Sequence, residues 1–407
     1  MRILNFGSCN IDYVYTVEHI VVPGETISSS KLELFAGGKG LNQSIAAARA
    51  GAKVFHAGCL GNDGGMLKEV LVDSGVDISN VTELDTKNGH AIIQVSSQGE
   101  NSIFLYPGSN ALVTKEIIDS VLKKFGKDDI LLLQNEISNV HYIIDEAFSK
   151  GMIIAFNPAP FTQSLKSIDF SKIGYLILNE TEAMGFTGIS DTQSCLDYIC
   201  NRFKNLTVIL TVGKEGSVYR HNDETIHQSA FDVKAIDTTA AGDTFIGYFL
   251  ASICDGIGVK KALKTASCAS AVTVSKMGAA PSIPYMSEVK EALINLKELS
   301  LDKRRLTSKK IEAYIEENLK TANLKGIAEI LGYTKEYAGI IIKKETGLTF
   351  SALLQKKKCE KAAELLTKTT MSVGEIIEET GYANQSFFRK QFKEIYGTTP
   401  LNFRKEN

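Results

Sequence analysis

The stretch Asp237-Thr-Thr-Ala-Ala-Gly-Asp243 runs directly into the apolar segment Thr-Phe-Ile-Gly-Tyr-Phe-Leu-Ala251, which has the composition of a buried helix. Small residues before a helix expose backbone N–H groups at its positive end, so this junction predicts an anion hole for a transferring phosphoryl group. Asp243 lies beside that hole, where a carboxylate can accept the proton of an attacking hydroxyl. The alternative is that Asp243 only stabilises the helix N-terminus and Gly242 only eases a turn.

A second glycine-rich segment, Phe35-Ala-Gly-Gly-Lys-Gly-Leu-Asn-Gln43, also opens a predicted helix. It is not a Walker loop, because Lys39 is not followed by Ser or Thr and the four-residue gap between glycines is absent. Its glycines allow close approach of a ligand, and Lys39 and Asn42 supply donors suited to sugar hydroxyls or phosphate. A flexible surface turn is the alternative.

Polar side chains stand where three predicted strands end. Alternation sends Asn10 and Asp12 to the same side, where they could chelate a diol. Glu136 follows the apolar run 131–133, and Asn179 and Glu182 follow the run 175–178. The carboxylates after these last two runs could instead cap the next helix.

Buried apolar runs alternate with helical patterns from residue 1 to about 298. This rhythm predicts an α/β domain with a mostly parallel sheet covered on both faces. Predicted strands are Ile3–Phe6, Val54–Gly58, Ile130–Leu133, Ile153–Phe156, Tyr175–Leu178 and Val208–Thr211, and predicted helices include Leu41–Arg49, Thr114–Phe125, Val140–Ser149 and a closing helix Ser287–Leu299.

Residues 13–36 and 89–107 break this rhythm with strand-like stretches and turn residues. We expect them to form a small antiparallel flap. Ligands of open α/β sheets bind outside the carboxyl ends of the strands, so the flap is a candidate lid over a ligand.

Composition indicates a cytoplasmic protein with reduced thiols and no membrane span. The seven cysteines are scattered without a Cys-x-x-Cys pair, and the longest apolar stretch, 245–254, is shorter than the roughly 20 residues of a membrane helix. Residues 303–407 hold 20 Lys and Arg against 13 Glu and no Asp, a net charge of +7, so the rest carries −9. This asymmetry favours a basic module that meets polyanions, although a solvated helical surface would have a similar composition.

Together these segments resemble the ribokinase-like (PfkB-type) carbohydrate kinase family over residues 1 to about 298. Further support comes from Phe156-Asn-Pro-Ala-Pro160 and Gly278-Ala-Ala-Pro-Ser-Ile-Pro284. The resemblance implies a three-layer αβα core with a small β lid, and transfer of a phosphoryl group from ATP to a sugar. D-ribose, converted to ribose 5-phosphate, is the leading substrate, with another pentose, a hexose or a nucleoside as alternatives.

The resemblance also implies a role for each motif residue. Asp243 would take the proton of the primary hydroxyl and Ala240, Ala241 and Gly242 would form the anion hole. The sugar would be held by Asn10, Asp12, Gly38, Lys39, Asn42, Glu136 and Asp243. The nucleotide would meet Asn179, Thr211, Gly213, Gly216, Gly242 and the neighbourhood of Ser267. Glu182 would act indirectly on Mg²⁺, and K⁺ or another monovalent cation would lie among Asp237, Thr239, Thr273, Lys276, Gly278 and Ser282, largely at backbone carbonyls.

Two positions depart from the family pattern. Thr239 replaces a common aliphatic residue, and Ser267 replaces a larger side chain near the adenine. Both changes leave the chemistry intact but bear on the preference for nucleotide or cation.

After a charged linker, 299–306, residues 307–407 lose the strand rhythm and resolve into about seven helices. They resemble the DNA-binding domain of AraC-type transcription regulators, with two helix-turn-helix units joined by a long helix. The units are 324–345 and 373–395, and the connecting helix spans 351–366.

The resemblance implies that the second helix of each unit enters the major groove of double-stranded DNA. The expected readers are Gln385, Ser386, Arg389 and Lys390, with Lys335 as a phosphate contact. Gly339, Ile340 and Ile341 occupy a stretch where a polar residue is usual, which puts base reading by the first unit in doubt. A helical bundle used only for protein contacts is the alternative.

Two functions therefore compete. One is an active sugar kinase whose tail also binds DNA, and the other is a regulator whose kinase body only senses a sugar. The intact Lys39, Glu182, Gly242 and Asp243 favour the kinase. We also expect a homodimer formed through the flap, because strand-rich edges pair readily.

Overall fold

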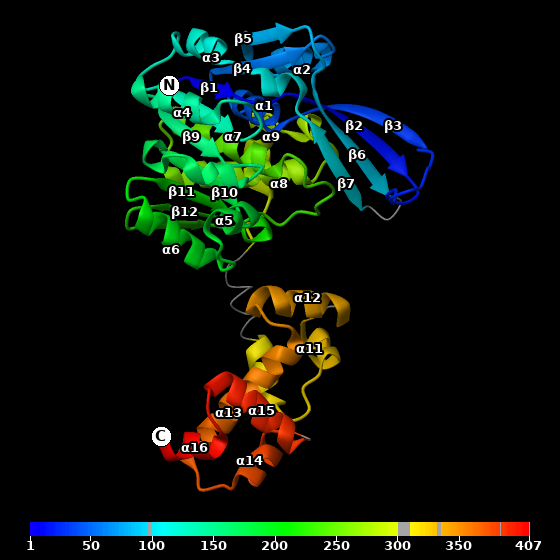
Figure 1. Cartoon of the computed structure of the whole chain (residues 1–407), viewed down its shortest axis with the longest axis vertical. Helices are drawn as coiled ribbons and strands as arrows, with labels where there is room; N and C mark the ends of the chain where they lie inside the picture. Colours follow the sequence, from blue (N-terminus) through cyan, green and yellow to red (C-terminus); the bar gives the residue numbers. More distant parts are fainter. Residues whose placement is uncertain (97–99, 300–309, 332–334, 383, 407) are drawn as a thin grey trace. The chain divides into compact units, whose positions relative to one another are not determined.

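The computed structural model describes residues 1–96, 100–299, 310–331, 335–382 and 384–406, in two compact units, Met1–Leu299 and Ser300–Asn407 (Figure 1). Apart from Leu299, the expected linker 299–306 lies outside the described residues. So do the start of the expected helical domain (307–309), the centre of the flap turn (97–99) and the turn of the first helix-turn-helix unit (332–334). Within the described part of the chain, no helix combines the length and apolarity needed to cross a membrane.

The first unit is built on a nine-stranded sheet that is parallel except at one edge. Its order is β13-β12-β11-β10-β9-β8-β1-β4-β5, and only β12 and β13 run antiparallel to their neighbours. The strands are β1 (Ile3–Phe6), β4 (Val54–Gly61), β5 (Asp77–Leu84), β8 (Ile130–Gln134), β9 (Ile153–Asn157), β10 (Tyr175–Asn179), β11 (Thr207–Thr211), β12 (Ser217–His221) and β13 (Glu224–Gln228).

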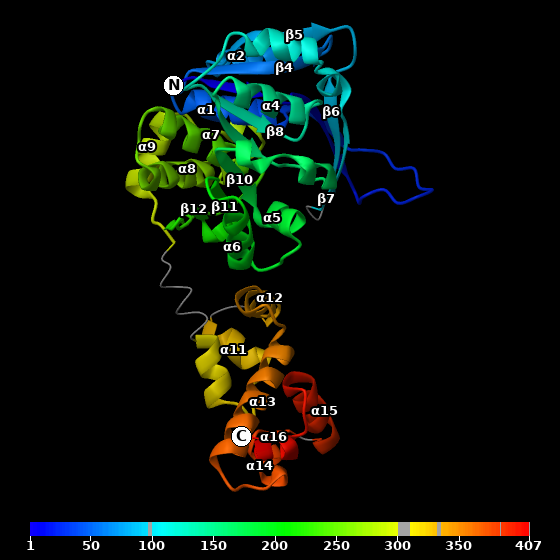
Figure 2. The same ribbon diagram turned by 60° about the vertical axis from the view of Figure 1, so that its left-hand side comes forward.

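Alternate residues of the central strands enter two separate cores. In β8, Leu132 packs with α1 (Lys39–Arg49), α2 (Gly65–Asp73), α7 (Ala241–Cys254), α8 (Val259–Val274) and α9 (Met286–Asn295). Its neighbours Leu131 and Leu133 pack with α3 (Lys115–Leu122), α4 (Val140–Ser149), α5 (Glu180–Thr187) and α6 (Thr192–Arg202). The continuous apolar runs are thus explained by a sheet that is buried on both faces, and the three layers are visible in Figure 2.

The closing helix is shorter than its pattern predicts. Helix α9 ends at Asn295, whereas the apolar spacing predicted a helix as far as Leu299. The last residues instead run alongside residues 230–232: the Leu299 N–H donates to the Ala230 carbonyl at 2.7 Å, and the Asp232 N–H donates to the Lys297 carbonyl at 2.8 Å. Pairing with a distant segment therefore replaces the last helical turn.

The flap is a separate four-stranded sheet of order β3-β2-β6-β7, formed by β2 (Asn10–Val17), β3 (Lys31–Gly37), β6 (Gly89–Ser96) and β7 (Asn101–Tyr106) (Figure 1). The expectation of an antiparallel flap is wrong for its central pair, because β2 and β6 run parallel. The two strands come from distant parts of the chain, so no hairpin fixes their direction. The outer pairs are antiparallel, as expected.

The second unit is helical wherever its secondary structure is regular. Its helices include residues 310–317, α11 (Leu324–Leu331), α12 (Lys335–Thr346), α13 (Phe350–Lys368), α14 (Val373–Glu379), α15 (Gln385–Tyr396) and α16 (Pro400–Glu406). Two clusters of buried side chains hold it together, one around Ile315 and Ile342 and the other around Phe388 and Phe392. Each cluster includes the buried side chains of one of the two expected helix-turn-helix units.

Candidate active site

The catalytic candidate Asp243 is buried where α7 meets α1. Its Oδ2 accepts a hydrogen bond from the Asn42 amide at 3.1 Å, and its Oδ1 accepts one from the Gln43 amide at 2.9 Å. The helices approach closely because Gly247 faces α1: a Cβ there would lie 2.5 Å from the Ala46 Cβ. Two sequence motifs about 200 residues apart thereby form one site.

Backbone donors surround the start of α7. Ala240, the N-cap, has φ 59° and ψ 7°, a left-handed conformation that ends the preceding loop and begins the helix. The Ala241 N–H bonds to the Thr238 carbonyl at 3.3 Å. In the part of the chain that the structure describes, the N–H groups of Gly242 and Asp243 have no protein acceptor. Two free donors at the positive end of a helix can bind an anion.

The sugar-binding candidates line the base of the flap. Asn10 is the first residue of β2, and its Oδ1 accepts a hydrogen bond from the Asn110 amide at 2.8 Å. Both side chains line a cavity of about 330 Å³ together with Glu136, Tyr106 and other residues. The Asn42 Oδ1 is buried and has no hydrogen-bond partner among the described residues, so it is available to a ligand hydroxyl.

Two acidic side chains lie close enough at this end to affect each other's charge. Asp12 fits over Gly37, where a Cβ would fall only 2.1 Å from its Oδ2. Burial, followed by repulsion from Glu136, raises the pKa of Asp12 to about 7. Burial also raises the pKa of Glu136, although this carboxylate accepts hydrogen bonds from the Ser8 hydroxyl and from the Lys39 N–H, the latter at 3.1 Å.

Lys39 opens α1 directly after Gly38, whose φ is 94°. Burial opposes its charge, but the nearby carboxylates of Asp243, Glu136 and Glu182 outweigh that effect and raise the pKa of Lys39. The ammonium group therefore stays charged among three carboxylates. Such a group can balance the negative charge of a phosphate that enters the site.

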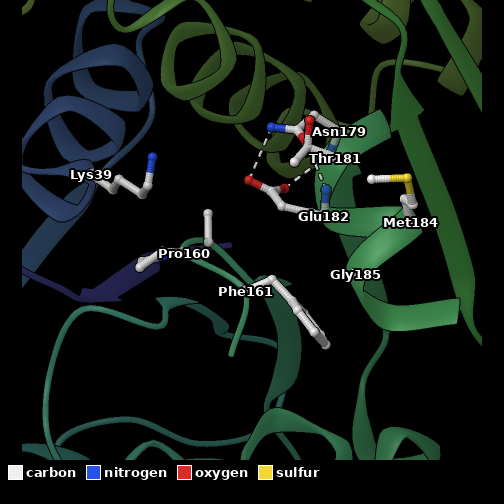
Figure 3. Close-up of a pocket in the computed structure, with 9 residues that line it drawn as sticks. Lys39, Pro160, Phe161, Asn179, Thr181, Glu182, Met184 and Gly185 are labelled. Atoms are coloured by element: carbon white, nitrogen blue, oxygen red, sulfur yellow. Dashed lines mark hydrogen bonds between the residues drawn. The ribbon is translucent and has the colours of Figure 1, made fainter. Parts of the chain in front are cut away.

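Asn179 and Glu182 form a capping box at the start of α5. The Asn179 amide donates to one Glu182 carboxylate oxygen at 3.0 Å, and its backbone N–H donates to the other at 3.0 Å. Figure 3 shows Lys39 on the opposite side of a cavity of about 480 Å³, which Phe161 and Met184 also line. Capping and facing a ligand cavity are therefore compatible roles for Glu182.

The nucleotide candidates are spread over three elements. Thr211 ends β11 beside Asn179 of β10, and Gly213 and Gly216 shape the turn into β12. Ser267 lies on α8 with its side chain buried, and its hydroxyl donates to the Ser229 carbonyl at 3.1 Å. The hydroxyl of Ser267 is thus engaged within the protein.

The monovalent-cation candidates come from two neighbouring loops that Asp237 joins. One oxygen of this carboxylate accepts hydrogen bonds from the Thr239 N–H at 2.9 Å and hydroxyl at 2.6 Å, and the other accepts one from the Gly278 N–H at 3.0 Å. Ser282 is buried and donates to the Ala279 carbonyl at 2.7 Å. Lys276 pairs with Glu288 at 2.6 Å, so its side chain points to a carboxylate.

Thr273, the remaining cation candidate, is fully buried on α8. Its hydroxyl donates to the Ala269 carbonyl at 3.1 Å and forms a hydrogen bond with the Thr244 hydroxyl of α7 at 3.0 Å. Its own carbonyl accepts the Lys276 N–H at 3.1 Å. The two helices are thereby joined next to the start of α7.

Sequence reasoning missed several polar residues of the site. Ser8, Asn110, Gln43 and Asn157 are buried and hydrogen-bonded to the predicted residues or to one another. Gln43 lies within a motif that the sequence singled out, and Asn157 lies within Phe156-Asn-Pro-Ala-Pro160. The only sequence signal for Gln43 and Asn157 was therefore their position as amide side chains within these two motifs.

The predicted DNA-reading residues share the start of α15. Asn384 caps this helix by accepting hydrogen bonds from the Ser386 and Phe387 N–H groups at 2.9 and 3.0 Å. Gln385, Ser386, Arg389 and Lys390 are exposed, while Phe388 and Phe392 anchor the opposite side in the core. In α12, Lys335 is exposed and Ile340 is 62% exposed, which leaves an apolar side chain where a reader would stand.

A three-layer α/β unit with a flap, and with a carboxylate beside free donors at a helix N-terminus, defines a phosphotransferase that acts on hydroxyl groups. Residues 2–286 match the pfkB family of carbohydrate kinases, and residues 327–406 match a helix-turn-helix domain.

Ribokinases are among the relatives of the first unit. One from Haemophilus influenzae is 35% identical over 297 residues, covering 70% of this chain and 96% of that protein. The crystal structure of ribokinase from Thermotoga maritima superimposes with a TM-score of 0.65 at 33% identity, covering 72% of this chain and all of the other. Ribokinase of Arabidopsis thaliana, solved with ribose and ATP, gives a TM-score of 0.64 at 28% identity, covering 72% and 98%.

The chain belongs to the pfkB family of carbohydrate kinases. It is an ATP-dependent, ribokinase-like sugar kinase that carries a C-terminal DNA-binding helix-turn-helix domain of AraC type.

Proposed function

We propose that the chain phosphorylates D-ribose at its primary hydroxyl to give ribose 5-phosphate. The observation that carries this proposal is the buried Asp243 carboxylate, held by Asn42 and Gln43 beside the N–H groups of Gly242 and Asp243, for which the described residues provide no acceptor. Support for ribose comes from relatives named ribokinase and from a similar enzyme solved with ribose and ATP.

Asp243 accepts the proton of the hydroxyl as its oxygen bonds to the γ-phosphorus of ATP. The bond between that phosphorus and the bridging oxygen breaks, and ADP leaves. The Gly242 and Asp243 N–H groups and the Lys39 ammonium stabilise the charge on the transferring group. Asn10, Asp12, Gly38, Asn42 and Glu136 hold the sugar.

The residues at the phosphate end fit a Mg²⁺ ion that arrives with the nucleotide. Mg²⁺ is usually held by one or two carboxylates plus waters and phosphate oxygens, and Glu182 faces the cavity across from Lys39 as a single carboxylate. Mg²⁺ would neutralise charge on the phosphates. The joined loops 237–239 and 276–282 supply carbonyls and the Asp237 carboxylate, which suit K⁺ or another monovalent cation.

Exchange of Asp243 for Asn tests the proposed base. We expect sugar-dependent ADP formation by Asp243→Asn to fall at least 100-fold, because general-base catalysis contributes about 10² to 10⁴ in rate. Asp255→Asn is the matched control, since Asp255 caps the other end of α7 and should leave turnover unchanged. Equal rates for wild type and Asp243→Asn, or no turnover by either with a panel of sugars, would overturn the proposal.

The C-terminal unit is proposed to read promoter DNA through α15. The exposed Gln385, Ser386 and Arg389 lie at the capped N-terminal end of this helix, the end that contacts base edges in helix-turn-helix proteins. Lys390, one turn after Ser386 in α15, is the fourth proposed reader, and Lys335 would add a phosphate contact.

Loss of Arg389 and Lys390 tests this surface. We expect Arg389→Ala with Lys390→Ala to weaken salt-sensitive promoter binding at least 10-fold. Lys123→Ala with Lys127→Ala removes the same charge from exposed positions of the kinase unit and should bind as wild type. Undiminished binding by the α15 variant rejects the assignment of readers.

The flap is proposed to join two copies of the chain into a homodimer. Strand β7 is exposed along its whole length, including Ile103 at 53%, Phe104 at 57% and Leu105 at 54%. An exposed apolar strand at a sheet edge is suited to pairing with another copy. Light scattering should show a dimer that Phe104→Lys converts to monomer, and a monomeric wild type would dismiss the pairing.

The proposed partners also bear on the location of the protein. Because DNA and ATP are its proposed partners, we propose that the protein is located in the cytoplasm.

A further inference from the structure

We propose that Gln43 is a positioning residue that holds the Asp243 carboxylate in its reactive orientation. This inference rests on the proposed role of Asp243 as the base. Gln43 is completely buried, and its side chain lines neither the cavity beside the flap nor the one beside α5. Its amide is placed to act on the carboxylate without contacting the sugar.

Both N–H bonds and the oxygen of the Gln43 amide form hydrogen bonds with buried side chains. Its Nε2 donates to Asp243 Oδ1 at 2.9 Å and to Asn157 Oδ1 at 3.1 Å. Its Oε1 accepts from Gln134 Nε2 at 2.6 Å, and the same Gln134 nitrogen donates to Asn5 Oδ1 at 3.0 Å. Gln43 thus bonds to buried side chains of α7, β9 and β8, and Gln134 extends the network to Asn5 of β1.

Groups that can only accept hydrogen bonds determine the direction of this network. The Asn5 amide donates to the Gly40 carbonyl at 2.7 Å, and the Asn157 amide donates to the Ile177 carbonyl at 3.0 Å. Each of these two side chains therefore presents its oxygen to the neighbouring glutamine. An ionised Asp243 also accepts only, so Gln43 must turn its NH₂ group toward the carboxylate.

The network restrains the carboxylate on the side away from the sugar. Asn42 holds Oδ2 at 3.1 Å, and its Oδ1, which has no partner in the described part of the chain, is available to a ligand. Gln43 instead has both N–H bonds and its oxygen engaged within the protein. Through Asn157, whose amide lies 3.5 Å from Glu182 Oε2, the same network reaches the phosphate end. Gln43 thus connects the Asp243 carboxylate, through Asn157, to the Glu182 carboxylate at the phosphate end.

Replacement of Gln43 by Met removes the hydrogen bonds with little change in volume. We expect kcat to fall roughly 10- to 100-fold, because small displacements of a reacting group cost that much. The KM for the sugar should stay within about twofold, since Gln43 does not touch it. The acidic limb of the kcat profile should move up by about one pH unit, because a donor to the charged form of the base is lost.

Two comparisons separate positioning from a general effect on folding. Asn80→Leu deletes another buried polar side chain, on β5, and should leave the pH profile unchanged. In an Asp243→Asn background, Gln43→Met should lower the residual rate less than twofold, since the group it positions is gone. Thermal unfolding of each variant establishes that it is folded at the assay temperature.

An unmoved acidic limb in folded Gln43→Met overturns the inference, as does an equal loss in both backgrounds. If Asp243→Asn keeps the wild-type rate, the proposed base is wrong. If Asp243→Asn is inactive while Gln43→Met matches wild type, the positioning role alone is wrong.

Discussion

Burial beside Glu136 raises the pKa of Asp12 to about 7, so this carboxyl titrates within the pH range in which kinases are assayed. As a sugar ligand it acts as an acceptor, and protonation removes part of that capacity. If only the ionised form binds, the sugar KM should rise about tenfold from pH 8 to pH 6. Steady-state kinetics across this range test the expectation, and Asp12→Asn should lack this dependence.

The raised pKa of Asp12 also makes the free energy of unfolding depend on pH, but here low pH is favourable, whereas it weakens sugar binding. A folded-state pKa above the ordinary value near 3.8 means that the native state binds more protons than the unfolded chain between about pH 4 and pH 7. The contribution of Asp12 to the free energy of unfolding therefore decreases as pH rises through this window. Urea titrations should show Asp12→Asn gaining stability over wild type toward pH 8.

Local chemistry predicted some residues of the site and not others. Asp243, Lys39 and Asn42 stand out because each lies in a glycine-rich segment that opens a predicted helix, although helix capping or a turn was the alternative. Gln43 does not, because its role depends on Gln134 and Asn157, which are distant in the sequence and reach it only through the sheet. Buried networks depend on tertiary contacts that residue spacing does not contain.

At the scale of elements, the crossing of α1 and α7 determines whether the two motifs meet. A Cβ at Gly247 would lie 2.5 Å from the Ala46 Cβ and 2.6 Å from the Ala47 nitrogen, so Gly247→Ala must push the helices apart. We expect a loss of about 1 to 3 kcal/mol in the free energy of unfolding and a lower kcat.

The control for this prediction is Gly65→Ala at the start of α2, where an added Cβ meets nothing within 4 Å. Alanine also has the higher helix propensity, so Gly65→Ala should be neutral or stabilising by up to about 1 kcal/mol. Chemical denaturation measures both variants. Similar stabilities for Gly247→Ala and wild type would show that the crossing tolerates a methyl group.

The elements predicted best are those whose pattern has a single physical cause. The apolar runs of β1 and β8 to β11 were predicted within a residue or two, since a strand buried on both faces admits few polar residues. Strands β5, β12 and β13 were not identified. β5 and β13 are the edges of the sheet and β12 lies next to one of them, and their partly exposed residues give patterns that resemble those of loops. The parallel pairing of β2 with β6 joins segments about 80 residues apart, which no local turn specifies.

At the scale of the whole molecule, sugar phosphorylation and DNA binding belong to separate compact units. Each unit has its own buried clusters, so a chain ending after Leu299 should fold and retain kcat and sugar KM within about twofold. Kinetics and calorimetry on this fragment provide the measurement. Failure to fold, or loss of turnover in a folded fragment, would show that the kinase depends on the C-terminal unit.

The charge asymmetry was visible in the sequence and agrees with the separation of sugar phosphorylation and DNA binding into two units. Residues 303–407 carry +7 while the remainder carries −9, and the basic part includes the helix-turn-helix match. Net charge indicates a polyanionic partner, but it does not say which helix reads bases. That assignment came from the resemblance to AraC-type DNA-binding domains, and the structure adds that these residues are exposed at the capped start of α15.

The position of β1 has a consequence for how the protein is made. Although β1 is synthesised before the other strands of the sheet, it lies between β4 and β8 in the interior of the sheet, and its register with β8 requires residues near 130. The catalytic groups meet only when α7 emerges, about 200 residues after α1. Contacts of such long range fold slowly and leave apolar strands exposed on the nascent chain, so we expect the kinase unit to need chaperone protection during translation, while the helical unit folds quickly from local contacts.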